Sequence, residues 1–263
     1  MENCQNCNDA IAVNFCASCG QKKIKRIDKK YIWDELQYTF IHTNKGFLYS
    51  IKNILRNPGK TAREFIDGNR VNHYKPINLL FLLVAFGTFI STKLIGFDKI
   101  MKKNYTEMGI NTKVQEGIMT YIMSYPQIMM VLMIPFCALL TRIVFRKWGN
   151  NFYEHVVINT FMLNFYSLIN LILLYPILYL LRNDAPSTVF GIMNLTYLFL
   201  PFMFYFFFKE FYPNETRKRI IIKVSQLILL SIVSFFLLII LLVFLGLFIA
   251  MLWKPEVIQA IKK

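Results

Sequence analysis

The chain has 263 residues, of which 56% are hydrophobic, and it carries 30 Lys and Arg against 15 Asp and Glu. An ordinary globular domain is about 45–50% apolar and spreads its apolar residues along amphipathic elements. Here the apolar residues form blocks of about 20, the length that a bilayer-spanning helix needs. The composition therefore excludes an ordinary water-soluble domain and predicts an all-α polytopic membrane protein.

The formal net charge of +15 first suggests nucleic acid as a partner. The basic residues, however, lie at the edges of the apolar blocks, as the positive-inside rule and attraction to anionic lipid headgroups would place them. We therefore expect the partners to include a membrane with anionic lipid headgroups, and we expect no nucleic acid.

Four of the five cysteines lie near the beginning of the chain, as the pairs Cys4-x-x-Cys7 and Cys16-x-x-Cys19. Each pair directs two thiolates at one point, and two pairs supply the tetrahedral set that Zn²⁺ prefers. Two disulfides in an oxidising compartment are the alternative. Residues 1–21 lack the apolar core of a signal peptide and a basic segment follows, so we expect reduced thiols in the cytoplasm. The prediction is a zinc ribbon whose metal is structural, because all four positions are filled by cysteine.

Residues 22–75 contain thirteen Lys and Arg, with apolar residues returning at helical spacing. We expect amphipathic helices at 31–42 and 46–57, and a third from Thr61, where Thr61 and Glu64 form a capping-box pattern and Gly68 ends the helix. Such helices lie flat on an anionic membrane; a small cytoplasmic subdomain is the alternative. The residues expected to bind the membrane surface are Arg63, Arg70, His73 and Lys75.

The run NPGKTAREFIDGNRVNHYKPINLLFLL, with GFLYS before it and CASCGQ near the beginning of the chain, resembles a family of uncharacterised membrane proteins from Bacteroidota. That family shares a CxxC…CxxCGQ head and an R-x-P-G…R-E-x-x-x-G-x-R…Y-x-P juxtamembrane signature. The resemblance covers residues 4–85 and is weaker beyond them. It implies an inner-membrane location and a zinc ribbon. Because the family has no agreed activity, the resemblance assigns no catalytic residues.

Five apolar blocks are long enough to cross about 30 Å of hydrocarbon. We expect transmembrane helices at 76–96, 118–145, 153–181, 187–208 and 221–253. Outside the apolar cores of these blocks, 21 Lys and Arg lie on the side of the N-terminus and 9 on the other side. The positive-inside rule then places the N-terminus in the cytoplasm and the C-terminus in the periplasm of a bacterial inner membrane.

The predicted organisation has four parts along the chain. They are a zinc ribbon at 1–21, basic amphipathic interfacial helices at 22–75, a five-helix transmembrane bundle at 76–253 and a short tail at 254–263.

The third apolar block carries a line of polar residues. His155, Asn159, Tyr166 and Asn170 share one helical face, with Glu154 beside its beginning. This face could line a polar cavity or substrate path, with Glu154 and His155 handling an ion or proton. It could equally supply hydrogen bonds between helices, worth about 0.6 kcal/mol each. Both interpretations remain open.

The sequence contains no phosphate-binding loop, no H-E-x-x-H and no G-x-S-x-G motif. We therefore expect a non-enzymatic inner-membrane protein that acts as a docking or regulatory platform, or as a complex subunit, with a protein partner still to be identified. The alternative is a small homo-oligomeric permease or lipid-handling carrier that uses the polar face of the third helix.

Overall fold

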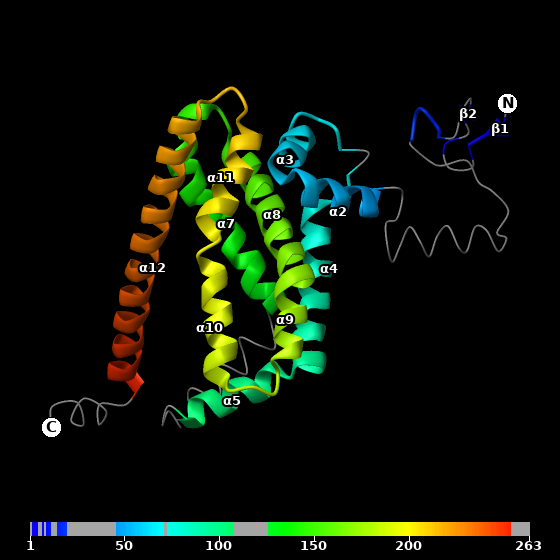
Figure 1. Cartoon of the computed structure of the whole chain (residues 1–263). Helices are drawn as coiled ribbons and strands as arrows, with labels where there is room; N and C mark the ends of the chain where they lie inside the picture. Colours follow the sequence, from blue (N-terminus) through cyan, green and yellow to red (C-terminus); the bar gives the residue numbers. More distant parts are fainter. Residues whose placement is uncertain are drawn as a thin grey trace. The chain divides into compact units, whose positions relative to one another are not determined.

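The computed structural model describes residues 2–4, 7, 9–11, 15–19, 46–70, 73–107 and 126–253. The helix predicted at 31–42 and the tail at 254–263 lie outside the described residues. The chain divides into two compact units, Met1–Phe47 and Leu48–Lys263 (Figure 1).

The first unit is built on a short β-hairpin. Strands β1 (Glu2–Asn3) and β2 (Ala10–Ile11) pair antiparallel, with Glu2 opposite Ile11. Inside the hairpin, the N–H of Cys4 donates to the carbonyl of Asp9 at 2.8 Å. The buried cluster among the described residues of this unit consists of Cys4 and Cys16. So small a core needs a disulfide or metal to hold it.

The second unit is helical. Its elements are α2 (Gly46–Arg56), which begins just before the unit, α3 (Pro58–Ile66), α4 (Pro76–Phe89), the π-helix η2 (Ile90–Ile95), α5 (Phe97–Glu107), α7 (Pro126–Phe145), the 3₁₀ turn η3 (Arg146–Trp148), α8 (Phe152–Ile169), the π-helix η4 (Asn170–Leu174), α9 (Tyr175–Leu180), α10 (Pro186–Tyr197), α11 (Leu200–Phe211) and α12 (Arg217–Trp253).

Four stretches of the described chain are long and apolar enough to cross a membrane: Pro76–Ile95, Phe152–Leu180, Pro186–Phe211 and Arg217–Leu241. Helix α7 adds a further apolar helix of 20 residues whose only charged residue is Arg142. The prediction of an all-α membrane protein with about five spans is confirmed.

Prolines stand at the beginning of several of these helices, although Pro135 lies inside α7. Pro58, Pro76 and Pro186 stand in the first turn of α3, α4 and α10, where a missing N–H costs nothing. Pro201 stands in the first turn of α11 and divides the fourth span at residues 198–199. Pro176 stands in the first turn of α9, directly after the π-helical turn η4.

Helix α3 begins three residues before the predicted Thr61. The side chain of Asn57 accepts a hydrogen bond from the N–H of Lys60 and caps the helix, with Pro58 at the first position. Thr61 lies inside the helix, where its hydroxyl donates to the carbonyl of Asn57 at 2.8 Å. The capping-box prediction was wrong because an Asn-Pro pair starts a helix at least as well as the Thr-Glu pattern after it. Gly68, at φ +114°, ends the helix as predicted.

Helix α8 is central to the packing of this unit. It contacts α7, α4 and α3, and α3 also contacts α11. The rings of Phe145 and Phe208 stack with centroids 4.3 Å apart, while Phe161 of α8 meets Phe65 of α3 at 5.5 Å. The short helix α3 is thereby fixed to the end of the bundle.

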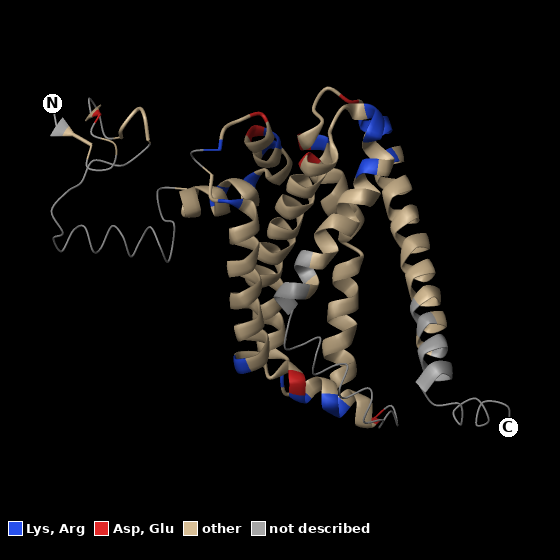
Figure 2. Cartoon of the chain, turned by 180° about the vertical axis from the view of Figure 1, so that it is seen from behind, with Lys and Arg blue, Asp and Glu red and all other residues tan. Residues whose placement is uncertain are grey.

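The two ends of the bundle differ in charge (Figure 2). Helices α2 and α3 share one end with the α7–α8 and α11–α12 loops, while α5 and the α9–α10 turn lie at the other. The first end, called the basic end below, carries Lys52, Arg56, Lys60, Arg63, Arg70, Lys75, Arg142, Arg146, Lys147, Lys209, Arg217, Lys218, Arg219 and Lys223. The described part of the other end carries Lys93, Lys99, Lys102, Lys103 and Arg182.

Candidate functional site

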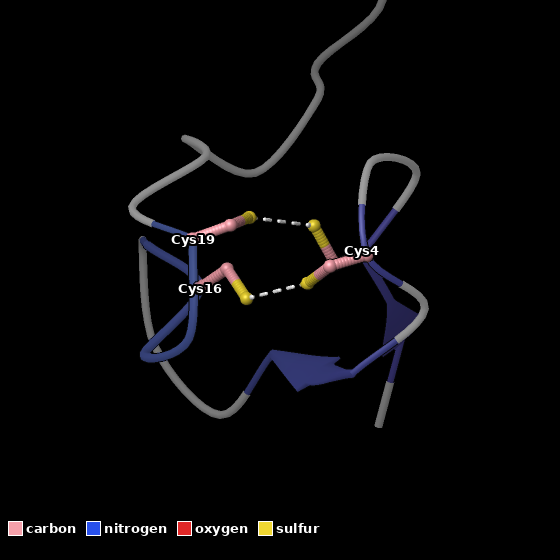
Figure 3. A group of neighbouring side chains, drawn as sticks. Cys4, Cys16 and Cys19 are labelled. Atoms are coloured by element: carbon pink, nitrogen blue, oxygen red, sulfur yellow. Dashed lines mark hydrogen bonds between the residues drawn. The ribbon is translucent and has the colours of Figure 1, made fainter.

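The four cysteines of the first unit converge on one point. Their sulfur atoms all lie within 4.8 Å of one another, and Cys4 and Cys16 are buried. The Sγ atoms of Cys4 and Cys19 are 3.5 Å apart, and those of Cys7 and Cys16 are 3.4 Å apart. The side chains of Cys4, Cys16 and Cys19 point toward one another (Figure 3).

This geometry fits a tetrahedral metal. With Zn–S bonds of about 2.3 Å, tetrahedral angles place the sulfur atoms about 3.8 Å apart, close to the distances observed. Four thiolates also complete the coordination shell, so no position is left for substrate or a reactive water. The residues that would hold the ion are the four predicted ones.

Hydrogen bonding within the cluster controls protonation of Cys7. The backbone N–H of Asp9 lowers the pKa of this thiol, but hydrogen bonds with the thiols of Cys16, Cys19 and Cys4, together with desolvation, raise it further, to about 12. A metal held by this thiol would have to displace its proton, as is general for thiolate sites.

The four residues predicted to bind the membrane surface lie in different environments. Arg70 and Lys75 are exposed and Arg63 is half-buried, whereas His73 is only 6% exposed. The imidazole of His73 packs edge-on to Tyr49, with centroids 5.2 Å apart, and neither ring nitrogen has a hydrogen-bond partner. Its ring thus lies within the protein.

The docking of α3 on α11 was not predicted from the sequence. The amide of Asn57 donates to Glu210 at 3.2 Å. A Cβ at Gly59 would collide with the carbonyl oxygen of Phe207 and lie 2.8 Å from the nitrogen of Phe211. The Asn57-Pro58-Gly59 sequence therefore both caps the helix and permits backbone contact, and the glycine directly after a helix-starting proline was the available signal.

The predicted polar line of α8 divides among several partners. Glu154 completes a capping box with Asn151 at the beginning of the helix. His155 is fully buried. The amide of Asn159 donates to the hydroxyl of Thr141 on α7 at 2.8 Å and to the carbonyl of His155 at 2.7 Å.

Asn164, which lies off the predicted face, also connects two helices. It is fully buried, and its amide donates to the carbonyl of Pro76 at 2.9 Å. This bond joins α8 to the beginning of α4. Periodicity alone could not reveal it, because the partner is a backbone group 88 residues away.

The remaining residues of the line border two cavities. Tyr166 and Asn170 line one of about 250 Å³ between the α4–η2 and α8–η4–α9 segments, together with Thr88, Ser91 and Tyr175. Tyr166 and Asn159 line a second of about 230 Å³ that Cys137 also borders. The two ends of the line therefore face different neighbouring helices.

In comparison with known proteins, one family matches part of the chain. A family described as "Protein of unknown function (DUF3667)" matches residues 44–87, which comprise α2, α3, the following loop and most of α4. No curated protein and no solved structure matches the chain. Over residues 44–87, the chain is therefore similar to this family of unknown function.

Proposed function

We propose that the chain is a non-enzymatic membrane protein whose zinc ribbon serves as a docking or regulatory platform for a protein partner. The observation that carries this proposal is the four-cysteine cluster. It has no open coordination position, and it belongs to a compact unit distinct from the apolar helices.

Zinc is the metal that best suits this donor set. Four thiolates in tetrahedral arrangement select zinc or iron–sulfur chemistry, and two short Cys-x-x-Cys turns are typical of structural zinc. Such an ion contributes folding free energy directly. Its role would be to hold a small binding surface in shape.

The orientation follows from the charge of the bundle ends. We place the basic end in the cytoplasm of a bacterial inner membrane by the positive-inside rule. The N-terminal side, with its ribbon, would then face a reducing compartment that keeps the thiols available for metal.

Cross-linking in native membranes tests the platform. We would compare the wild-type chain with the double variant Cys4→Ser/Cys19→Ser, using Cys137→Ser as the matched control outside the cluster. The partner cross-linked to the wild type should be lost from the double variant and kept by the control. Circular dichroism in detergent should show the same helix content in all three.

Retention of the same partner by the double variant, at wild-type yield, would contradict the platform. A partner lost equally from Cys137→Ser would also contradict it, because the interaction would then depend on the bundle.

The cavity of about 250 Å³ supports a second candidate, a lipid-handling carrier or permease. Its lining combines hydroxyl groups with Asn170, and the π-helices η2 and η4 flank it; π-helical turns are frequent at functional sites. Replacement of Asn170 by Leu should abolish lipid or solute transfer in vesicles. The same replacement at exposed Asn194 should have no effect, and equal transfer by both variants would exclude this path.

A further inference from the structure

A cavity of about 610 Å³ opens at the basic end of the bundle. Three segments line it: the end of α3, the α7–α8 loop and the α11–α12 loop. Its volume falls within the range of about 300–1,000 Å³ that ligand pockets usually have. The proposed platform function does not involve this cavity.

The cavity lies where the membrane-spanning segments end. Lining residue Asn150 stands two positions before the span that begins at Phe152, and Phe211 is the last residue of another. The α11–α12 loop joins that residue to Arg217, where a third span begins. Residues just outside spanning segments lie at the level of the lipid headgroups.

The wall of the cavity is held by contacts between the two loops. The rings of Trp148 and Tyr212 meet edge-on with centroids 4.6 Å apart, and the Tyr212 hydroxyl donates to Asn150 Oδ1 at 2.9 Å. Gly149, between Trp148 and Asn150 in the α7–α8 loop, adopts φ +94°, a backbone conformation that favours glycine. Trp and Tyr are also the residues enriched at the headgroup level of membranes.

The charged groups on the lining are available for a ligand. Arg63, Lys147 and Asp67 line the cavity, and none of the three forms an ion pair within the described part of the chain. The fourth charged group, Glu215, pairs with Arg219 at 3.2 Å. Two cations and one carboxylate of the lining therefore have no ion-pair partner among the residues that the structure describes.

We propose that this cavity binds a phosphate ester that also carries a primary ammonium group, the chemistry of a phosphoethanolamine headgroup. Arg63 and Lys147 bind the phosphate oxygens through charge-assisted hydrogen bonds. Asp67 accepts a hydrogen bond from the ammonium group. The trimethylated nitrogen of choline has no N–H and could not donate such a bond. The carboxylate gives the site its preference for a zwitterion over a simple anion.

Native mass spectrometry of the full-length chain tests this site. The detergent-solubilised protein is offered equal amounts of phosphatidylethanolamine, phosphatidylcholine and phosphatidylglycerol with identical acyl chains. The wild type should retain phosphatidylethanolamine about tenfold over the other two, a difference of about 1.4 kcal/mol. Arg63→Gln/Lys147→Gln should lose this retention, and Asp67→Asn should lose only the discrimination among the three lipids.

The matched control is Lys52→Gln/Lys218→Gln, which removes two exposed charges from the basic end outside the cavity. This control should retain the lipid as the wild type does. The proposal is overturned if the wild type shows no preference, or if the Arg63/Lys147 variant retains as much phosphatidylethanolamine as the control.

A competition with free phosphoethanolamine distinguishes the two sources of this chemistry. If an excess of free phosphoethanolamine does not displace the lipid, the site binds a membrane headgroup. If it does displace the lipid, the site binds a soluble phosphoethanolamine compound through the same three residues.

Discussion

Gly59 shows how a single residue positions α3. Its Cα faces the backbone of α11, where the atoms that a Cβ would meet belong to Phe207 and Phe211. Backbone atoms inside a helix cannot rotate away as a side chain can, so the added methyl group must push the two helices apart.

The change Gly59→Ala should therefore destabilise the protein by about 1–3 kcal/mol, the usual cost of overpacking. The matched control is Gly191→Ala on α10, where an added Cβ meets nothing within 4 Å. There the better helix propensity of alanine should stabilise by about 0.5–1 kcal/mol. Thermal unfolding in detergent measures both, and equal melting temperatures for the two variants would contradict the close helix contact.

His73, which packs against Tyr49 of α2, makes this packing sensitive to pH. Burial lowers the pKa of its imidazole below the ordinary value of 6.5, while the charge of Glu64 acts in the opposite direction. Above pH 6.5 the ring is neutral in both the folded and unfolded chain. Below it, the unfolded chain binds a proton that the folded chain does not, so stability falls as the pH falls.

The variant His73→Phe, which keeps a ring against Tyr49 and Phe65, should thus lose part of the fall in melting temperature between pH 8 and pH 5. Thermal unfolding of both proteins at each pH gives the difference. The same fall in both would show that His73 does not titrate with unfolding.

At the scale of elements, the hydrogen bond between Asn159 and Thr141 connects α8 to α7. The Thr141 hydroxyl also donates to backbone carbonyls of its own helix, at 3.0 Å to Cys137 and 3.1 Å to Ala138. It stays satisfied when Asn159 is removed, so the bond should contribute little more than an average interhelical one.

A double-mutant cycle with Asn159→Leu and Thr141→Val should yield a coupling free energy of about 0.6 kcal/mol. Reversible unfolding in mixed micelles provides the four free energies. A coupling near zero would show that the two side chains do not interact, while a value of several kcal/mol would indicate a larger polar network.

The elements that the sequence predicted best are those with long apolar runs. The spans expected at 76–96 and 153–181 agree with Pro76–Ile95 and Phe152–Leu180 within about one residue, because a membrane demands both length and apolarity. Helix α5 was not predicted, since its 11 residues mix Lys with apolar groups. It is an amphipathic helix whose Ile100 belongs to one buried cluster with Leu178 and Val189 of later segments, an arrangement that no local pattern specifies.

The candidate metal centre was predictable because its ligands are close in sequence and their chemistry is specific. The docking of α3 was not, since Asn57 finds Glu210 only through the fold, 153 residues away. The cavity at the basic end also combines three distant segments. Sequence periodicity identifies which residues share a helical face, but it does not identify the neighbouring helix.

At the scale of the whole molecule, the charge difference between the two bundle ends predicts which end faces the periplasm. Asn214 lies in the α11–α12 loop at the basic end, and Asp184 lies in the α9–α10 turn at the other; both are exposed. A membrane-impermeant maleimide should label Asp184→Cys in intact cells and Asn214→Cys only after lysis. The unmodified chain gives the background from its own cysteines, and the reverse labelling pattern would invert the proposed orientation.

The central proposal is that a structural zinc ion holds the ribbon of this membrane protein in shape. Native mass spectrometry of the intact, reduced chain, gently extracted from its own membrane, tests it most directly. We expect one zinc ion per chain in the wild type and none in Cys4→Ser/Cys19→Ser. A fully reduced, intact wild-type chain without zinc would contradict the claim.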